Sequence, residues 1–254
     1  MPFDFETVDT GATAWVLASA ALVLLMTPGL AFFYSGMVRA KHALGMLMQN
    51  YVTIAIVSLV WVLVGFSLAF GAGNGFIGDL HFAGLQNIGD TIPGYVDSFA
   101  QVIPPMVFVV FQLMFAVITP ALITGSTADR WKFGAFVPFI ALWSILVYSP
   151  VAHWVFSPAG WLFRRGALDF AGGTVVHINA GIAALAADGI AAQAFMNTNM
   201  AAAAAMLSWL LVERIKGGHA TTLGAASGAV AGLVAITPCA GFVGGMAPIY
   251  IGLV

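Results

Sequence analysis

Uninterrupted apolar stretches recur along this chain of 254 residues, and each is close to the ~20 residues that a helix needs to cross about 30 Å of hydrocarbon. Only 7% of the residues are charged and 61% are hydrophobic, whereas a soluble domain carries about 25% charged residues. The chain therefore cannot cover a water-facing surface. Because the apolar runs are continuous rather than alternating, they predict helices and not a barrel. The expected fold class is all-α, a polytopic helical membrane protein.

Seven membrane spans follow from these stretches. We expect them at about 12–34, 44–71, 99–124, 132–156, 168–187, 189–212 and 221–238. A last apolar piece at about 240–254 is too short to predict a full crossing. The chain contains 29 Gly and an Ala-rich run at 201–205, which suits close packing of helices in lipid.

Basic residues gather in the links that follow the first and third predicted spans: Arg39, Lys41, His42, Arg130 and Lys132. The long link at about 72–98 instead contains Asp and no Lys or Arg. By the positive-inside rule, the N-terminus and the long acidic link lie outside. Arg164 and Arg165 then fall outside as well, which is a mild exception to the rule.

A second basic pair, Arg214 and Lys216, conflicts with this orientation. In the predicted order the fifth span runs inward and the sixth runs outward, so both residues fall outside. One additional span between Lys132 and Lys216 would return the pair to the inner side.

The segment at 169–181, DFAGGTVVHINAG, places two ionisable side chains in apolar surroundings. Such a group costs roughly 3 kcal/mol or more in hydrocarbon, so it needs a partner or a function. His177 is either a buried histidine hydrogen-bonded to a neighbouring helix or a pore-lining imidazole. A neutral imidazole binds a small polar molecule or relays a proton without a fixed charge. Asp169 either caps the start of its helix or attracts cations.

Phe111 and Phe115 in FQLMF lie four residues apart, on one face of a helix. They form either a packing stripe or an aromatic gate, where stacked rings hold a cation that is losing water. The sequence contains no metal-ligand spacing, no nucleophile with a paired base and no phosphate-binding glycine loop, so we expect neither an enzyme, a metal nor a cofactor. The 8 Lys and Arg are too scattered for a nucleic-acid surface.

Four segments resemble the ammonium transporter family (Amt/Mep/Rh). They are TPGLAFFYSGMVRAKHALGMLMQN (27–50), VVFQLMFAVITPALITG (109–125), GALDFAGGTVVHINAG (166–181) and TTLGAASGAVAGLVAITPCAGFVG (221–244). The resemblance covers nearly the whole chain after about residue 10, and DFAGGTVVHINAG is specific to that family.

The resemblance implies a trimer of helical protomers, each with its own pore for ammonium-derived nitrogen. In that family, ammonium passes a double phenylalanine gate, loses a proton and crosses a dry pore lined by two histidines. By motif, Phe111 and Phe115 resemble the gate, His177 the first pore histidine and Asp169 the acidic residue beneath the recruitment site. Phe156 stands where the family usually has a vestibule tryptophan, an exchange that should weaken recruitment because it loses an N–H donor and the strongest cation–π surface.

The chain departs from the family in two places. INAGIAALAADGIAAQAFMNTNMAAAAAMLSW runs from the fifth span into what resembles the family's seventh, so about one internal span is missing at a junction near 187–189. This gap also explains the position of Arg214 and Lys216. The family's last spans, which carry the second pore histidine, have no counterpart before Val254. We therefore expect a single, incomplete transmembrane domain over residues 1–254.

The predicted function is transport of ammonium or ammonia through a hydrophobic pore that contains His177, with weak transport by this chain alone. The alternatives are a non-conducting subunit that senses ammonium or co-assembles with a full-length relative, and a non-functional remnant. The expected partners are ammonium or ammonia, the lipid bilayer, a homotrimer or a full-length relative, and a PII-type signalling protein. We expect the chain in the plasma membrane as a multi-pass protein with its N-terminus outside.

Overall fold

The computed structural model describes residues 2–95, 101–128, 130–187, 191–237, 239–240 and 243–253, and in these ranges it is helical, without a β-strand. Four segments are long and apolar enough to cross a membrane. They are α1 (Thr10–Met37), α2 with its continuation to α3 (Ala40–Phe70), α5 (Pro105–Thr127), and α6 to α7 (Phe133–Phe156). These segments correspond to the first four predicted spans, so the prediction of an all-α polytopic membrane protein is confirmed.

Two of these spans are continuous helices with a wider, π-helical turn in the middle. The second span runs as α2 (Ala40–Val60), η2 (Trp61–Gly65) and α3 (Phe66–Phe70), and the fourth as α6 (Phe133–Trp143), η4 (Ser144–Tyr148) and α7 (Ser149–Phe156). The remaining helices follow in order: η6 (Gly173–Ile178), α8 (Asn179–Ala187), α9 (Ala191–Gly217), α10 (Thr222–Ile236) and α11 (Ala247–Leu253). Short 3-10 turns lie at Phe5–Thr7 (η1), Ala83–Leu85 (η3) and Phe163–Arg165 (η5).

The later predicted spans differ from the observed helices. The fifth begins at Gly173 instead of 168 and is a shorter apolar helix, Gly173–Ala186, as is the seventh, Thr222–Ile236. The sixth corresponds to α9, a long helix that contains the polar run Asn197–Asn199. Residues 188–190, and with them most of the predicted junction near 187–189, lie outside the described residues.

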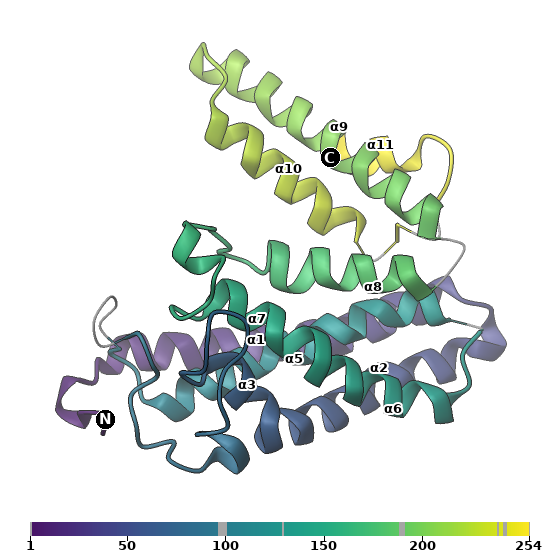
Figure 1. The fold of residues 1–254 in the computed structure, drawn as a ribbon. Helices are drawn as coiled ribbons and strands as arrows, with labels where there is room; N and C mark the ends of the chain where they lie inside the picture. Colours follow the sequence, from purple (N-terminus) through teal and green to yellow (C-terminus); the bar gives the residue numbers. More distant parts are fainter. Residues whose placement is uncertain are drawn as a thin grey trace.

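The helices form two groups (Figure 1). In the first, α1 packs against α2 and α5, α2 also packs against α5 and α6, and α8 packs against α5. In the second, α10 and α11 pack against α9, and this group leans away from the first. Asn197 helps to hold the second group together, because its buried side-chain amide donates to the carbonyl oxygens of Ala240 (2.6 Å) and Val243 (2.7 Å).

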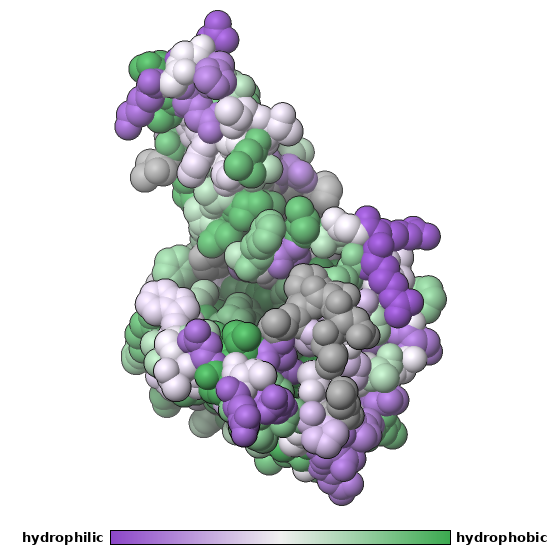
Figure 2. All heavy atoms as spheres, turned by 90° about the vertical axis from the view of Figure 1, so that its left-hand side faces the viewer, coloured by the Kyte–Doolittle hydropathy of each residue, from purple (hydrophilic) through white to green (hydrophobic). Residues whose placement is uncertain are grey.

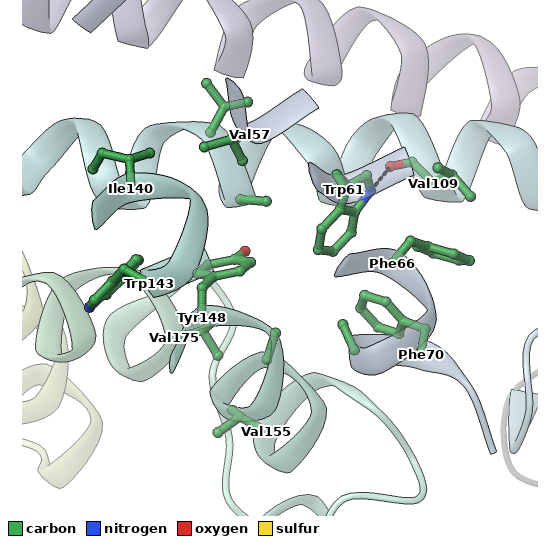
Figure 3. Close-up of a cluster of buried hydrophobic side chains, with 14 of the residues drawn as sticks. Val57, Trp61, Phe66, Phe70, Val109, Ile140, Trp143, Tyr148, Val155 and Val175 are labelled. Atoms are coloured by element: carbon green, nitrogen blue, oxygen red, sulfur yellow. Dashed lines mark hydrogen bonds between the residues drawn. The ribbon is translucent and has the colours of Figure 1, made fainter. Parts of the chain in front are cut away.

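The core of the first group is aromatic (Figure 3). The buried ring of Trp61 makes edge contacts with Phe66 (5.7 Å between centroids), Phe70 (6.3 Å) and Tyr148 (6.2 Å). The Trp61 indole N–H donates to the carbonyl of Val109 on α5 at 3.3 Å. This core therefore ties η2, α3 and η4 to the helix that carries Phe111 and Phe115.

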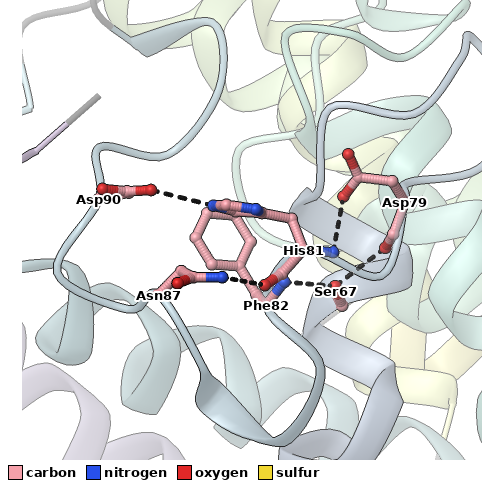
Figure 4. Close-up of polar contacts among 6 residues, drawn as sticks. All are labelled: Ser67, Asp79, His81, Phe82, Asn87 and Asp90. Carbon is pink, nitrogen blue, oxygen red and sulfur yellow. Dashed lines mark hydrogen bonds and ion pairs between the residues drawn. The ribbon is translucent and has the colours of Figure 1, made fainter.

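The acidic link at 72–95 is folded onto α3 by polar contacts (Figure 4). Ser67 on α3 donates to the carbonyl of Asp79 (2.9 Å) and accepts from the backbone N–H of Phe82 (2.9 Å). Within the link, His81 Nε2 lies 3.0 Å from the carboxylate of Asp90. These contacts fix the link at one end of the first group of helices.

Charged segments separate to the two ends of the bundle. The backbone N–H of Phe3 donates to Gly89 (2.8 Å), and that of Trp161 donates to Gly75 (2.9 Å), so the N-terminus, the acidic link and the segment that contains Arg164 and Arg165 share one end. The basic links between α1 and α2 and between α5 and α6 meet at the other end, where they line one cavity. This grouping agrees with the distribution that the positive-inside rule predicts.

Candidate functional site

His177 lies on η6, a π-helical turn inside an apolar helix. The turn is wide because the backbone N–H of His177 donates to Gly172, five residues earlier, at 2.9 Å. Gly172 has φ +78°, and a Cβ atom there would lie 2.6 Å from Cγ2 of Val176, so the turn requires glycine at this position. Such π-helical turns are frequent at functional sites.

The carboxylate of Asp169 caps the start of η6. Its two oxygens accept from the backbone N–H groups of Gly173 (2.8 Å), Thr174 (2.9 Å) and Val175 (3.0 Å). Since the first N–H groups of a helix have no partner within the helix, this negative charge satisfies three of them at once. Of the two roles that the sequence allowed for Asp169, the structure shows the capping role.

The His177 side chain is half-buried, and among the described residues its Nδ1 atom is buried without a hydrogen-bond partner. A buried polar atom that lacks a partner costs about 1–3 kcal/mol. The side-chain Nδ2 atom of Asn179, at the start of α8, is also buried without a partner among the described residues. This region of the bundle therefore has unused hydrogen-bonding capacity inside an apolar span.

Phe111 and Phe115 stack edge to face on α5, with centroids 5.0 Å apart and ring planes at 82°. Both rings are half-buried. Helix α5 packs against η6 and α8, so the pair lies on the helix next to the one that carries His177. The geometry is compatible with both a packing stripe and a gate, because edge-to-face pairs pack well in apolar surroundings and aromatic faces attract cations.

Phe156 is the last residue of α7 and packs against the aromatic core. Nearby, the indole of Trp154 donates to the carbonyl of Phe76 (2.6 Å) and contacts the ring of Trp161 at 6.0 Å. The guanidinium of Arg165 lies 5.1 Å from the centroid of the Trp161 ring. An internal cation therefore already lies over one aromatic face at this end of the bundle.

The five predicted site residues come from elements that meet around η6. Asp169 caps it, His177 lies on it, Phe111 and Phe115 lie on α5, and Phe156 ends α7, and η6 packs against both α5 and α7. Within this set, the side chains of Phe111 and Phe115 are in direct contact.

The sequence did not single out His153, one of the most buried polar residues. Its ring nitrogens lie 2.8 Å from the carbonyl oxygen of Ala69 and 2.7 Å from that of Asn74, and the residue is 0% exposed. Both partners are carbonyl oxygens, which only accept hydrogen bonds. AHWVF contains this histidine, but both of its partners are about 80 residues away along the chain.

In the ranges that the structure describes, no group of three or more His, Cys, Asp or Glu is placed to hold a metal ion. The long apolar helices define a multi-pass membrane protein.

Comparison with known proteins gives the family. The model of the Ammonium Transporter Family matches residues 14–193 and 184–254. An ammonium transporter of Bacillus subtilis is 46% identical over 290 positions, covering 97% of this chain and 70% of the relative. The crystal structure of Mep2 from Candida albicans superimposes with a TM-score of 0.68 at 31% identity, covering 99% of this chain and 66% of Mep2. A structure titled Sensor Amt Protein has a TM-score of 0.62 at 27% identity, covering 95% of this chain and 71% of that protein. The chain belongs to the ammonium transporter family, a family of transporters rather than enzymes.

The chain spans about two thirds of the length of these relatives, and part of the difference is internal. The alignment with the Bacillus subtilis relative extends over 290 positions, more than the 254 residues of the whole chain, so the relative contains residues that have no counterpart here. The family model matches in two stretches that meet within 184–193. The predicted lack of an internal segment relative to the family is therefore confirmed.

Proposed function

We propose that this chain takes part in moving ammonium-derived nitrogen across the plasma membrane, along a path that passes Phe111 and Phe115 and reaches His177. The observation that carries this proposal is the unpartnered Nδ1 atom of His177, buried within an apolar helix. A neutral imidazole offers one donor and one acceptor, which suits ammonia, a small molecule that both donates and accepts hydrogen bonds.

Selectivity in such a path follows from chemistry. Ammonium resembles potassium in size and charge, and an apolar pore rejects both as ions, because an unpaired charge is very costly in a medium of low dielectric. Ammonium alone can lose a proton and cross as a neutral molecule. A histidine relays or binds without adding a fixed charge to the pore.

The other residues support this path in different ways. Asp169 acts as a positioning residue, since its three hydrogen bonds fix the turn that carries His177. Phe111 and Phe115 act as the gate, where their ring faces stabilise a cation that is losing water by about 0.5–2 kcal/mol each. Phe156 contributes a weaker cation–π surface than tryptophan would at the outer end.

We also propose that the path is incomplete in the chain of 254 residues on its own. One face of the helix that follows His177 is exposed, with Ile178 at 50%, Ile182 at 61% and Leu185 at 40%. On the face shown in Figure 2, hydrophobic atoms run between the two groups of helices. The internal segment that relatives contain begins near the end of this same helix, so its absence leaves the wall of the path open and transport weak. A full-length relative that assembles with this chain would supply the missing cover.

Uptake of labelled methylammonium tests the proposal in cells that have no other ammonium transporter. Cells that express only this chain should take up the label at a rate close to that of cells without it. Robust, saturable uptake that is lost in His177→Ala would contradict the proposed impairment while supporting the histidine path.

The second candidate function is that of a non-conducting subunit that senses ammonium or assembles with a full-length relative. The exposed apolar face of α8 favours it, because such a face is suited to pack against another helix. Co-purification with a full-length relative, lost when Ile182 is replaced by Asn, would support this function. If the chain purifies as a monomer, without the relative, the result would instead support a non-functional remnant. Both candidate functions include an N-terminus outside the cell. Both also include a PII-type signalling protein, which would act from the basic, cytoplasmic end.

A further inference from the structure

The turn between α9 and α10 carries a pair of exposed cations. Arg214 and Lys216 lie in the last turn of α9, and both residues are exposed. The neighbouring carboxylate of Glu213 accepts instead from the backbone N–H of Thr221 (2.9 Å) and from its hydroxyl (3.1 Å). Within the described residues, the side chains of Arg214 and Lys216 form no ion pair or hydrogen bond. This segment, residues 214–219, is the basic tip.

The segment before α1 carries the opposite charge. Asp4, Glu6 and Asp9 are all exposed. Asp4 caps η1 by accepting from the backbone N–H of Glu6 (2.9 Å), and Asp9 caps α1 by accepting from that of Ala12 (2.6 Å). The carboxylate of Glu6 has no partner in the part of the chain that the structure describes. This segment, residues 4–9, is the acidic segment.

Two arginines at the same end of the bundle have other contacts. Arg164 Nε donates to the carbonyl of Pro158 at 3.5 Å, and the guanidinium of Arg165 lies over the ring of Trp161. Among the described residues, neither forms an ion pair with the acidic segment. The acidic segment therefore presents negative charge to its surroundings, which attracts a cationic partner.

The basic tip and the acidic segment lie on the same side of the molecule but apart from each other (Figure 1). Helix α9 has 27 residues and is about 40 Å long, which exceeds the ~30 Å of hydrocarbon, so its tip reaches the surface of the bilayer. In Figure 2, hydrophilic side chains gather at the top of the view, and hydrophobic atoms separate them from the hydrophilic ones below. The two charged segments therefore do not meet within one copy.

A basic pair at the acidic end of a membrane protein is an exception to the positive-inside rule. It follows from the internal segment that relatives contain and this chain lacks. The exception leaves cations and carboxylates at the same level of the bilayer without partners. A contact between copies would bring these opposite charges together.

We propose that the basic tip of one copy of this chain binds the acidic segment of a neighbouring copy. Arg214 and Lys216 lie against Glu6, and Asp4 and Asp9 add to the negative potential. Copies inserted in the same orientation hold both segments at the same level, on whichever side of the membrane that is, so they meet by lateral diffusion. The contact is independent of whether the chain conducts ammonium.

Each copy offers one basic tip and one acidic segment, so the contact is head-to-tail. A head-to-tail contact generates a closed ring when its rotation closes, which is compatible with the expected homotrimer. Exposed ion pairs are individually weak and are screened by salt. The contact therefore selects which surfaces of neighbouring copies meet, and its strength depends on ionic strength.

Disulfide trapping between copies in cell membranes tests the contact. Cys239→Ala removes the single cysteine of the sequence, and Thr7→Cys or Gly217→Cys then places one thiol beside each charged segment without changing its charge. Thr7 is exposed, and a Cβ atom at Gly217 would meet no other atom within 4 Å. The two variants carry different tags and are expressed together before oxidation. Disulfides between different variants should exceed those between copies of one variant about threefold, as expected for exposed charge pairs.

Charge reversal separates this contact from chance collision. Lys216→Glu and Glu6→Lys should each lower the yield of the mixed disulfide about threefold. Lys216→Glu in one copy together with Glu6→Lys in the other should restore it, because the pair again has opposite charges. Lys132→Glu, the same charge change at the opposite end of the bundle, is the matched control and should leave the yield unchanged. Raising the salt from about 0.1 M to about 1 M should lower the yield, since the Debye length falls from about 10 Å to about 3 Å.

A double exchange that fails to restore the yield would overturn the proposal, because it would show that these charges do not contact each other. Equal yields for mixed and same-variant pairs would also overturn it. So would a disulfide that closes within a single chain when both thiols are placed in it, because the contact would then be internal. A chance-level yield that rises when anionic lipid is removed from the membrane would identify lipid head groups as the partner of the basic tip and would contradict the contact between copies.

Discussion

Asp169 and His177 both lie in one apolar segment, but their environments differ. Asp169 accepts three backbone hydrogen bonds, whereas the Nδ1 atom of His177 has no partner in the described residues. The carboxylate of Asp169 is therefore held by the backbone of the turn, whereas the Nδ1 atom of His177 is available to a ligand. The same sequence motif therefore contains one structural residue and one candidate for function.

Replacing Asp169 tests its capping role. Asp169→Ala removes every acceptor and should lower the free energy of unfolding by about 0.5–2 kcal/mol, the range for a lost helix cap. Asp169→Asn keeps one acceptor oxygen without the charge and should lie between that variant and the wild type. Thermal unfolding in nanodiscs, followed by tryptophan fluorescence, measures the order. An Asp169→Ala variant as stable as the wild type would show that the cap is dispensable.

The sequence predicted the identity of these residues better than their contacts. For His153, the ring contacts carbonyl oxygens of Ala69 and Asn74, and no local pattern in AHWVF could reveal partners so distant in the chain. For Asp169, the two roles weighed from the sequence were separated only when the three N–H groups were seen to converge on the carboxylate. Phe111 and Phe115 were correctly placed on one helix face, because helical spacing alone determines it.

At the scale of elements, the first four long apolar spans were predictable from the sequence, and the start of the fifth was not. The first four spans follow from length and hydropathy, which are local properties of the sequence. The fifth begins at Gly173 because Gly172 adopts a left-handed conformation and Asp169 caps the helix that follows. Both effects depend on backbone geometry that the apolar run from 168 onward does not reveal.

Gly172 offers a direct test of the turn that carries His177. Gly172→Ala should lower the free energy of unfolding by about 1–3 kcal/mol, because φ is +78° there and a Cβ atom would lie 2.6 Å from Cγ2 of Val176. Gly173→Ala is the matched control, since a Cβ atom at Gly173 would meet no other atom within 4 Å. Equal stability of the two variants in nanodiscs would contradict the strained turn.

The hairpin of α9 and α10 depends on small residues at their contact. A Cβ atom at Gly232 would lie 2.5 Å from the carbonyl oxygen of Ala201 and 2.7 Å from Cβ of Ala205. Gly232→Ala should therefore force α9 and α10 apart and cost about 1–3 kcal/mol through overpacking. Gly181→Ala on α8, where a Cβ atom would be free of contacts within 4 Å, should leave the melting temperature unchanged. The hairpin does not depend on close packing if Gly232→Ala melts at the wild-type temperature.

At the scale of the whole molecule, the two groups of helices meet where the chain lacks a segment that its relatives contain. The sequence predicted this gap from the side on which Arg214 and Lys216 fall and from the order of the motifs. In Figure 1, the turn between α9 and α10 lies on the same side as the N-terminus. This position is the one expected when six spans, an even number, separate the N-terminus from that turn. How the two groups pack against each other depends on contacts between distant segments, and charge counting does not predict these.

The central claim is that His177 lies on a path for ammonium-derived nitrogen that a second chain must complete. Uptake of labelled methylammonium tests it most directly, in cells whose own ammonium transporters are deleted. The chain is expressed alone and together with a full-length relative. In a third set of cells, the His177→Ala variant of the chain is expressed together with the same relative. We predict uptake near background for the chain alone, an increase over the relative alone when the chain is co-expressed, and loss of that increase in His177→Ala. An increase that persists in His177→Ala, or no increase at all, would contradict the account.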